Sequence, residues 1–144
     1  IRMLDTLLIV RGEQQSKFTL GVGVDLKYPL QEALSLITPP PAIYQTAAPP
    51  SGATSGWLFH VDSKNVVCTH WEPLTGDGQV TGLHTRLQEA YGRPAKVTLS
   101  CFRKPSSARM VDWAGKTISE CEVEGDQVRF ELSPHQWREL EVSW

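Results

Sequence analysis

Apolar and polar residues alternate along most of this chain, which is the pattern of strands with one buried face. Short turn segments rich in Gly, Asp and Asn separate these stretches, as in antiparallel hairpins. The predicted strands cover residues 18–26, 57–61, 65–71, 79–91, 97–102, 108–113, 116–123, 127–132 and 137–144. The pattern therefore predicts an all-β fold, an antiparallel β-sandwich with two sheets packed face to face.

One amphipathic helix interrupts the strands. Residues 29–37 begin with a proline suited to a first helical turn, and four apolar residues fall on one face. We expect the whole chain, 1–144, to form a single β-sandwich domain that belongs to a longer protein, because it begins inside an apolar stretch without an initiator methionine. Its core is expected to contain six alternating apolar residues: Leu20, Val22, Val97, Leu99, Val128 and Phe130.

Residues 38–56 break the alternation. This segment holds five of the ten prolines, no charged residue, and the apolar Ile43 and Tyr44. A connection of this length is unusual inside a compact domain. It is either a loop on the sandwich's own edge or an arm, and we expect an arm that packs against the preceding domain.

The charge balance excludes several classes of partner. Fourteen basic and sixteen acidic residues give a net charge of −2, so there is no basic excess for nucleic acid or an anionic membrane surface. The apolar run 7–10 is far shorter than a membrane span. The three cysteines form no CxxC pair and are odd in number, which favours a reducing compartment, and we expect cytoplasmic localisation.

The sequence contains no recognised catalytic motif, and we assign no catalytic residue. Cys68 and His70 would share one face of a regular strand, with His60 nearby, which is the beginning of a zinc site. Since no fourth ligand has suitable spacing, we expect ordinary strand residues and no metal.

Two groups of residues remain as candidates for binding or structure. His70, Trp71 and Glu72 would make a small sugar-contacting platform, although a tryptophan also serves well as a core or interdomain residue. Arg86 and Glu89 lie near the end of a long strand and are candidates for structural ion pairs. Positions three apart fall on opposite faces of a regular strand, so these two pair with each other only across a bulge, or each pairs elsewhere.

The same region carries a resemblance to a known family. Asn65-Val66-Val67, then Arg86-Leu87-Gln88-Glu89-Ala90-Tyr91-Gly92, then Val97-Thr98-Leu99 resembles the progression "N-V-V … R-L-x-E-x-x-G … V-x-L". That progression belongs to the C-terminal β-domain of glycoside hydrolase family 38 α-mannosidases. Residues 108–115 and 128–140 are similar to the hairpin and the closing strands of such domains.

The resemblance implies a galactose-mutarotase-like sandwich that serves as the non-catalytic C-terminal accessory domain of an α-mannosidase-like enzyme. Such a domain braces the preceding catalytic domain, its main partner, and can contribute to the cleft for an oligosaccharide. In the family the catalytic aspartate and the zinc ligands belong to an N-terminal α/β domain, so no cofactor is assigned to this chain. The alternatives are an autonomous carbohydrate-binding module and a general interaction sandwich.

Overall fold

The computed structural model describes residues 11–12, 14, 17–38, 42, 44 and 57–144. The chain divides into two units, 1–40 and 41–144, and each is described by itself. The expected arm at 38–56 lies outside the described residues, apart from Thr38, Ala42 and Tyr44. Within the described ranges, none of the helices is long and apolar enough to cross a membrane.

The first unit contains the predicted helix, α1 (Pro29–Ile37), with Pro29 in its first turn. Its last turn is closed by Thr38, whose backbone nitrogen and Oγ1 both donate to the carbonyl of Leu34, at 2.8 and 2.7 Å. The strand expected at 18–26 is absent from the described part of this unit, and Val22 is 94% exposed. The reason is physical: alternation stabilises a strand only when another strand pairs with it, and Gly21 and Gly23 offer no side chain for packing.

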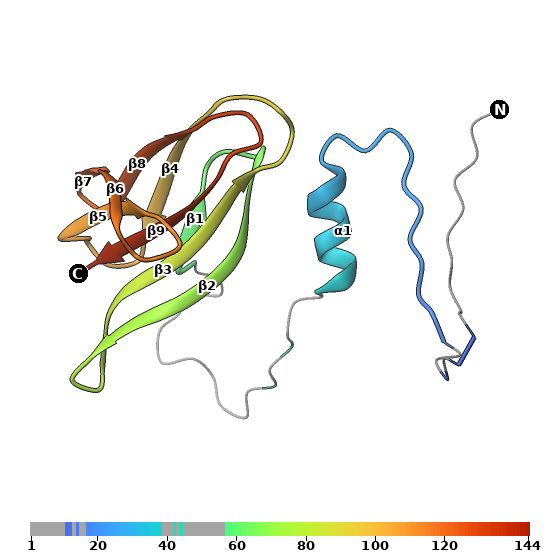
Figure 1. Ribbon diagram of the computed structural model, residues 1–144, viewed down its shortest axis with the longest axis horizontal. Coiled ribbons are helices and arrows are strands. Elements are labelled where there is room, and N and C mark those ends of the chain that lie inside the picture. Colours follow the sequence, from blue (N-terminus) through green and yellow to red (C-terminus); the bar gives the residue numbers. More distant parts are fainter. Residues whose placement is uncertain (1–10, 13, 15–16, 39–41, 43, 45–56) are drawn as a thin grey trace. The chain divides into compact units, whose positions relative to one another are not determined.

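The second unit is the predicted antiparallel sandwich (Figure 1). One sheet has four strands in the order β1-β4-β8-β7, and the other has five in the order β2-β3-β9-β5-β6. The strands are β1 (Phe59–Val61), β2 (Val66–Gly76), β3 (Gln79–Glu89), β4 (Ala95–Cys101), β5 (Ser107–Val111), β6 (Thr117–Glu120), β7 (Glu122–Glu124), β8 (Gln127–Leu132) and β9 (Trp137–Ser143).

The core lies between the two sheets and contains the inward-facing apolar residues of both. Leu87 and Leu140 from the five-stranded sheet, and Leu99 and Val128 from the four-stranded sheet, are completely buried. Of the predicted core, Val97, Leu99 and Val128 are confirmed and Phe130 packs at its margin. Leu20 and Val22 are exposed, so their assignment to the core was wrong.

The strand predicted at 116–123 is in fact two strands. β6 belongs to the five-stranded sheet and β7 to the four-stranded sheet, and Cys121 lies at the corner between them. The corner is held by the backbone nitrogen of Cys121, which donates to the carbonyl of Ala108 at 2.9 Å. A chain that changes sheets keeps its alternation through the corner, so the periodicity did not reveal the break.

Candidate functional site

A bulge in β2 determines which way the candidate residues point. The pairing with β3 shifts between Cys68 and His70, so that Cys68 lies opposite Leu87 and His70 lies opposite Arg86. Cys68 therefore packs against the core, where burial raises the pKa of its thiol, while His70 lies on the outer face of the sheet. The expectation that Cys68 and His70 share one face was wrong, because the extra residue reverses the alternation.

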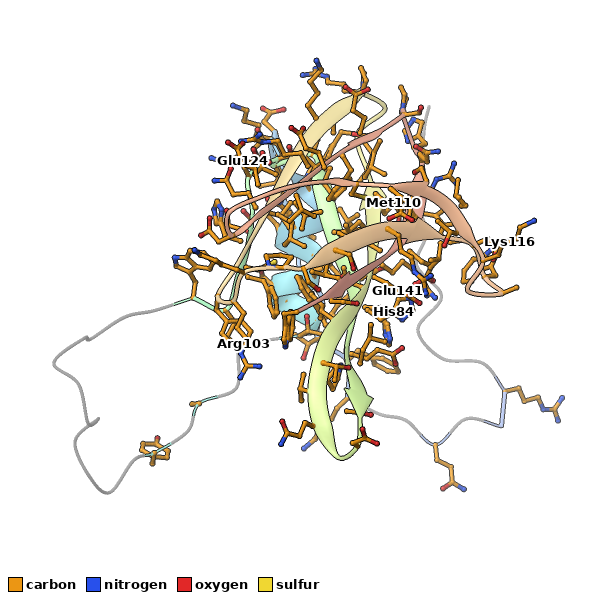
Figure 2. The ribbon with its side chains drawn as sticks, turned by 90° about the vertical axis from the view of Figure 1, so that its left-hand side faces the viewer. His84, Arg103, Met110, Lys116, Glu124 and Glu141 are labelled. Carbon is orange, nitrogen blue, oxygen red and sulfur yellow. The ribbon has the colours of Figure 1, made fainter. Side chains whose placement is uncertain are left out.

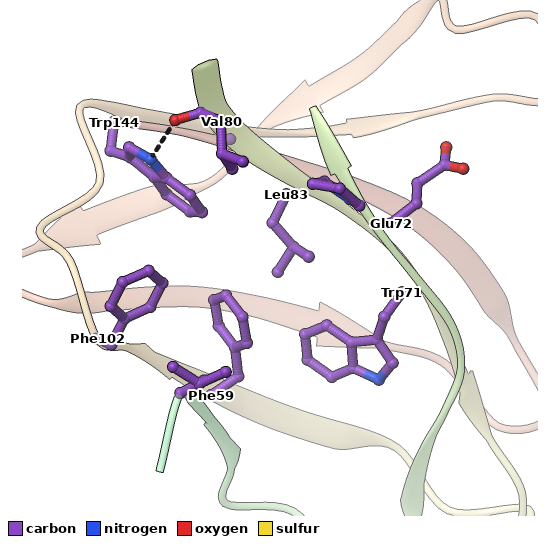
Figure 3. Close-up of a pocket in the computed structure, with 10 residues that line it drawn as sticks. Phe59, Trp71, Glu72, Val80, Leu83, Phe102 and Trp144 are labelled. Atoms are coloured by element: carbon purple, nitrogen blue, oxygen red, sulfur yellow. Dashed lines mark hydrogen bonds between the residues drawn. The ribbon is translucent and has the colours of Figure 1, made fainter. Parts of the chain in front are cut away.

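The three residues expected to form one sugar platform lie on two faces of the sheet. His70 and Glu72 point outward, and their side chains contact each other with His70 Nε2 3.3 Å from Glu72 Oε2. Trp71 points to the other face, where its ring stacks against Phe59 with centroids 5.1 Å apart. In Figure 3 the Glu72 carboxylate points away from the ring of Trp71. Successive residues of a strand cannot form one surface.

Trp71 instead belongs to an aromatic hollow at one end of the sandwich. We use this name for the open space of about 370 Å³ whose walls include the rings of Phe59, Trp71, Phe102 and Trp144 (Figure 3). Phe102 and Trp144 meet edge to face at 5.7 Å, and Trp144 Nε1 donates to the carbonyl of Val80 at 3.2 Å. These rings are held in place by one another, yet Trp71 and Phe102 are 41% and 47% exposed.

The opposite, outer face of the five-stranded sheet is polar and charged. Arg86 donates from Nε and Nη2 to Glu139 Oε1, at 2.7 and 2.6 Å, although the Glu139 side chain is only 4% exposed. The other oxygen of Glu139 lies 2.7 Å from His84 Nε2. Next along the same face, Arg109 makes a matching contact with Glu141, which Figure 2 labels beside His84. The sequence had singled out Arg86 but neither His84 nor Glu139.

Two tryptophans adjoin this charged face. Trp113, in the turn after β5, and Trp137, at the start of β9, have ring centroids 3.9 Å apart. The guanidinium of Arg86 lies 4.7 Å from the centroid of the Trp113 ring, a cation–π contact. Trp113 is 68% exposed, so its ring presents an open surface next to charged side chains.

Glu89 lies on the inner face and is completely buried. Its oxygens accept hydrogen bonds from the backbone nitrogens of Tyr91, Gly92 and His135 and from Asn65 Nδ2, all within 2.8–3.0 Å. Burial acts to raise the pKa of this carboxyl, but the hydrogen bonds outweigh it and lower the pKa to about 2. The two candidates for ion pairing thus have separate partners: Arg86 pairs with Glu139, and Glu89 binds uncharged donors.

Comparison with known proteins gives no assignment. No protein-family model, no curated protein and no solved structure matches this chain.

Proposed function

We propose that this sandwich is a non-catalytic accessory domain of an α-mannosidase-like glycoside hydrolase, and that the aromatic hollow is the surface with which it braces the catalytic domain. The observation that carries the proposal is the hollow itself. Four aromatic rings surround an open apolar space, and Leu58 at its rim is 64% exposed. A concentrated apolar surface of this kind is the mark of a site that another protein surface covers.

The preceding catalytic domain of the same polypeptide is the occupant that fits best. β1 follows directly on the segment that leads into the sandwich, and Phe59 of β1 lies in the centre of the ring cluster. The chain therefore enters the sandwich beside the hollow, since Leu58 and Phe59 both line it. The hollow offers apolar contact and no catalytic constellation, in keeping with a role in bracing.

The residues that carry the resemblance to family 38 have a structural use that suits an accessory domain. In the progression R-L-x-E-x-x-G, Leu87 fills the core, Glu89 binds the following turn, and Gly92 takes a backbone conformation with φ of 73°. These residues therefore stabilise the end of β3 and the turn that follows it. No zinc ligand or catalytic aspartate of the family is assigned to this chain.

The test compares the isolated chain with the complete product of its gene. The isolated chain is expected to leave an aryl α-mannoside unhydrolysed, and the complete product is expected to hydrolyse it. Phe102→Asp places a charge in the hollow, and Ile118→Asp is a matched control, since Phe102 is 47% and Ile118 49% exposed. Phe102→Asp should lower the melting temperature of the complete product by more than it lowers that of the isolated chain, and it should accelerate limited proteolysis between the domains, whereas Ile118→Asp should affect both proteins equally.

Two results would contradict the proposal. One is the absence of any hydrolase domain in the complete gene product. The other is a loss of melting temperature on Phe102→Asp that is equal in the isolated chain and in the complete product, which would mean that nothing covers the hollow.

A second candidate, the autonomous carbohydrate-binding module, is favoured by Trp113. Its exposed ring rests on Trp137 and beside Arg86, and sugar-binding surfaces commonly combine an aromatic face with charged hydrogen-bonding groups. Binding of the isolated chain to a glycan array would support this function if Trp113→Ala abolished it. Trp57→Ala, at a ring that is 54% exposed, is the control.

A further inference from the structure

Three side chains of types that commonly bind metal ions lie close together on the outer face of the β2–β3 hairpin. His70 and Glu72 come from β2, and His84 comes from β3, directly opposite Glu72 in the pairing of the strands. One donor atom from each residue lies within 4.8 Å of the others. The bulge before His70 and the register at His84 place all three on the same face.

The outer contacts of His84 resemble those of a metal ligand. Its Nε2 lies 2.7 Å from Glu139 Oε2, and Glu139 is in turn fixed by Arg86. Metal-binding histidines generally donate their second ring N–H to a carboxylate, and Glu139 Oε2, which is buried and has no hydrogen-bond partner among the described residues, is placed to accept it. His84 Nδ1 lies 2.7 Å from Glu72 Oε1, and a proton on Nδ1 makes this contact a hydrogen bond. A metal ion would take the place of this proton between the two atoms, and the remaining proton of His84 would then lie on Nε2, facing Glu139.

The local charge also favours a cation. Glu72 and Glu139 bring two negative charges, Arg86 supplies one positive charge, and the nearby Glu141 is paired with Arg109. With neutral histidines the cluster has a net charge of −1. Two imidazoles and one carboxylate are ligands typical of zinc, whereas calcium and magnesium prefer oxygen ligands alone.

We propose that His70, Glu72 and His84 bind a Zn²⁺ ion, that Glu139 orients His84 from the outer shell, and that the fourth position is open to water or to a ligand from outside. This site is independent of the proposed function. Tetrahedral zinc with bonds of about 2.0–2.1 Å places its ligand atoms about 3.3 Å apart. His70 Nε2 and Glu72 Oε2 already have a separation of 3.3 Å, and the half-exposed Glu72 side chain has room to adjust.

A bound zinc ion would link the edge strand β2 to its neighbour β3. β2 is an edge strand of its sheet and is bulged just before His70, and among the described strands it pairs with β3 alone. Zinc bound between the two strands would stabilise the folded chain by mass action, and the melting temperature would rise with zinc concentration.

The experiment is zinc titration by calorimetry on the chain after treatment with a chelator. One ion per chain is expected, with a dissociation constant of about 10 μM or lower. Glu139→Gln should weaken binding about 10- to 100-fold, and His84→Ala should weaken it further. His60→Ala is the control, since it removes an exposed imidazole outside the cluster, and it should leave the affinity unchanged.

Cobalt substitution provides a readout that does not depend on the stability of a variant. Co²⁺ bound to the wild-type chain should give the visible bands of a tetrahedral or five-coordinate site without thiolate charge transfer, because Cys68 faces the core. Three results would overturn the proposal: no binding at about 100 μM zinc, affinity that survives in folded His84→Ala, or a thiolate band in the cobalt spectrum.

Discussion

The carboxylate of Glu89 lies 2.8 Å from the backbone nitrogen of His135, 46 residues further along the chain. The same oxygen accepts a hydrogen bond from the nitrogen of Gly92, and the other oxygen accepts from Tyr91 and Asn65. One buried side chain thus joins the end of β3 to the loop before β2 and to the loop between β8 and β9. Since all four donors are uncharged, the carboxylate is stabilised by hydrogen bonds alone.

Glu89→Gln should destabilise the sandwich by about 3 kcal/mol, because the new amide group directs its N–H bonds at backbone donors that it cannot satisfy. Urea unfolding followed by tryptophan fluorescence measures the effect. Glu131→Gln is the control: Glu131 is exposed and lies 3.7 Å from Lys96, and its loss should change the free energy of unfolding by less than about 0.5 kcal/mol. Equal effects would mean that the buried carboxylate has no special role.

The lowered pKa of Glu89 predicts that the free energy of unfolding depends on pH. The pKa of Glu89 is lowered from its ordinary value of 4.5 to about 2 in the folded chain. Its stabilising effect should therefore be complete above pH 4.5 and be lost as the pH falls toward 2. The difference in unfolding free energy between wild type and Glu89→Gln should shrink over this window. A difference that stays constant down to pH 2 would contradict this assignment.

Gly92→Ala should cost more stability than Gly115→Ala. Both glycines have a left-handed backbone, with φ of 73° and 75°, and each alanine should lose about 1 kcal/mol for that reason. At Gly92 the new Cβ would also lie 2.8 Å from Nε2 of His135, whereas Gly115 has open space. Thermal unfolding of the two variants isolates the added steric cost. If the clash is its source, Gly92→Ala should lose less stability in a His135→Ala background.

The fold could be predicted from alternation because the sandwich buries one face of its longer strands. At β4 the sequence alternates without interruption, and Val97 and Leu99 are buried as expected. Alternation describes a single strand, however, and does not tell whether a partner exists. Residues 18–26 alternate as well as β4 does, yet none of the described residues in that stretch forms a strand.

The cluster of His70, Glu72 and His84 could not be predicted from the sequence, because it depends on the pairing register between β2 and β3. Gly76 pairs with Gln79 at the hairpin turn, and a regular ladder from there would place Glu72 opposite Leu83. The shift between Leu74 and Thr75 places Glu72 opposite His84 instead. One inserted residue moves a side chain to the other face. Gly82 beside the insertion and Pro73 in β2 are residue types typical of bulged or edge strands, but they do not fix where the insertion lies.

Two arginine–glutamate pairs on the outer face should contribute differently to the free energy of unfolding. Arg86 contacts Glu139, whose side chain is 4% exposed, and Arg109 contacts Glu141, whose side chain is 20% exposed. Arg86→Ala leaves a buried carboxylate with His84 as its remaining close partner and removes the cation from the Trp113 ring. We expect a loss of about 2 kcal/mol for Arg86→Ala and less than about 1 kcal/mol for Arg109→Ala.

Urea unfolding of both variants at low and high salt checks this prediction. The small effect of Arg109→Ala should diminish in 1 M salt, since solvent and ions screen an exposed pair. The effect of Arg86→Ala should persist, because the cost arises from burying Glu139 without its partner rather than from attraction through water. The native fluorescence should also change for Arg86→Ala, because its guanidinium lies over Trp113. If both effects vanish in salt, Glu139 is reached by solvent and the outer face has no buried ion pair.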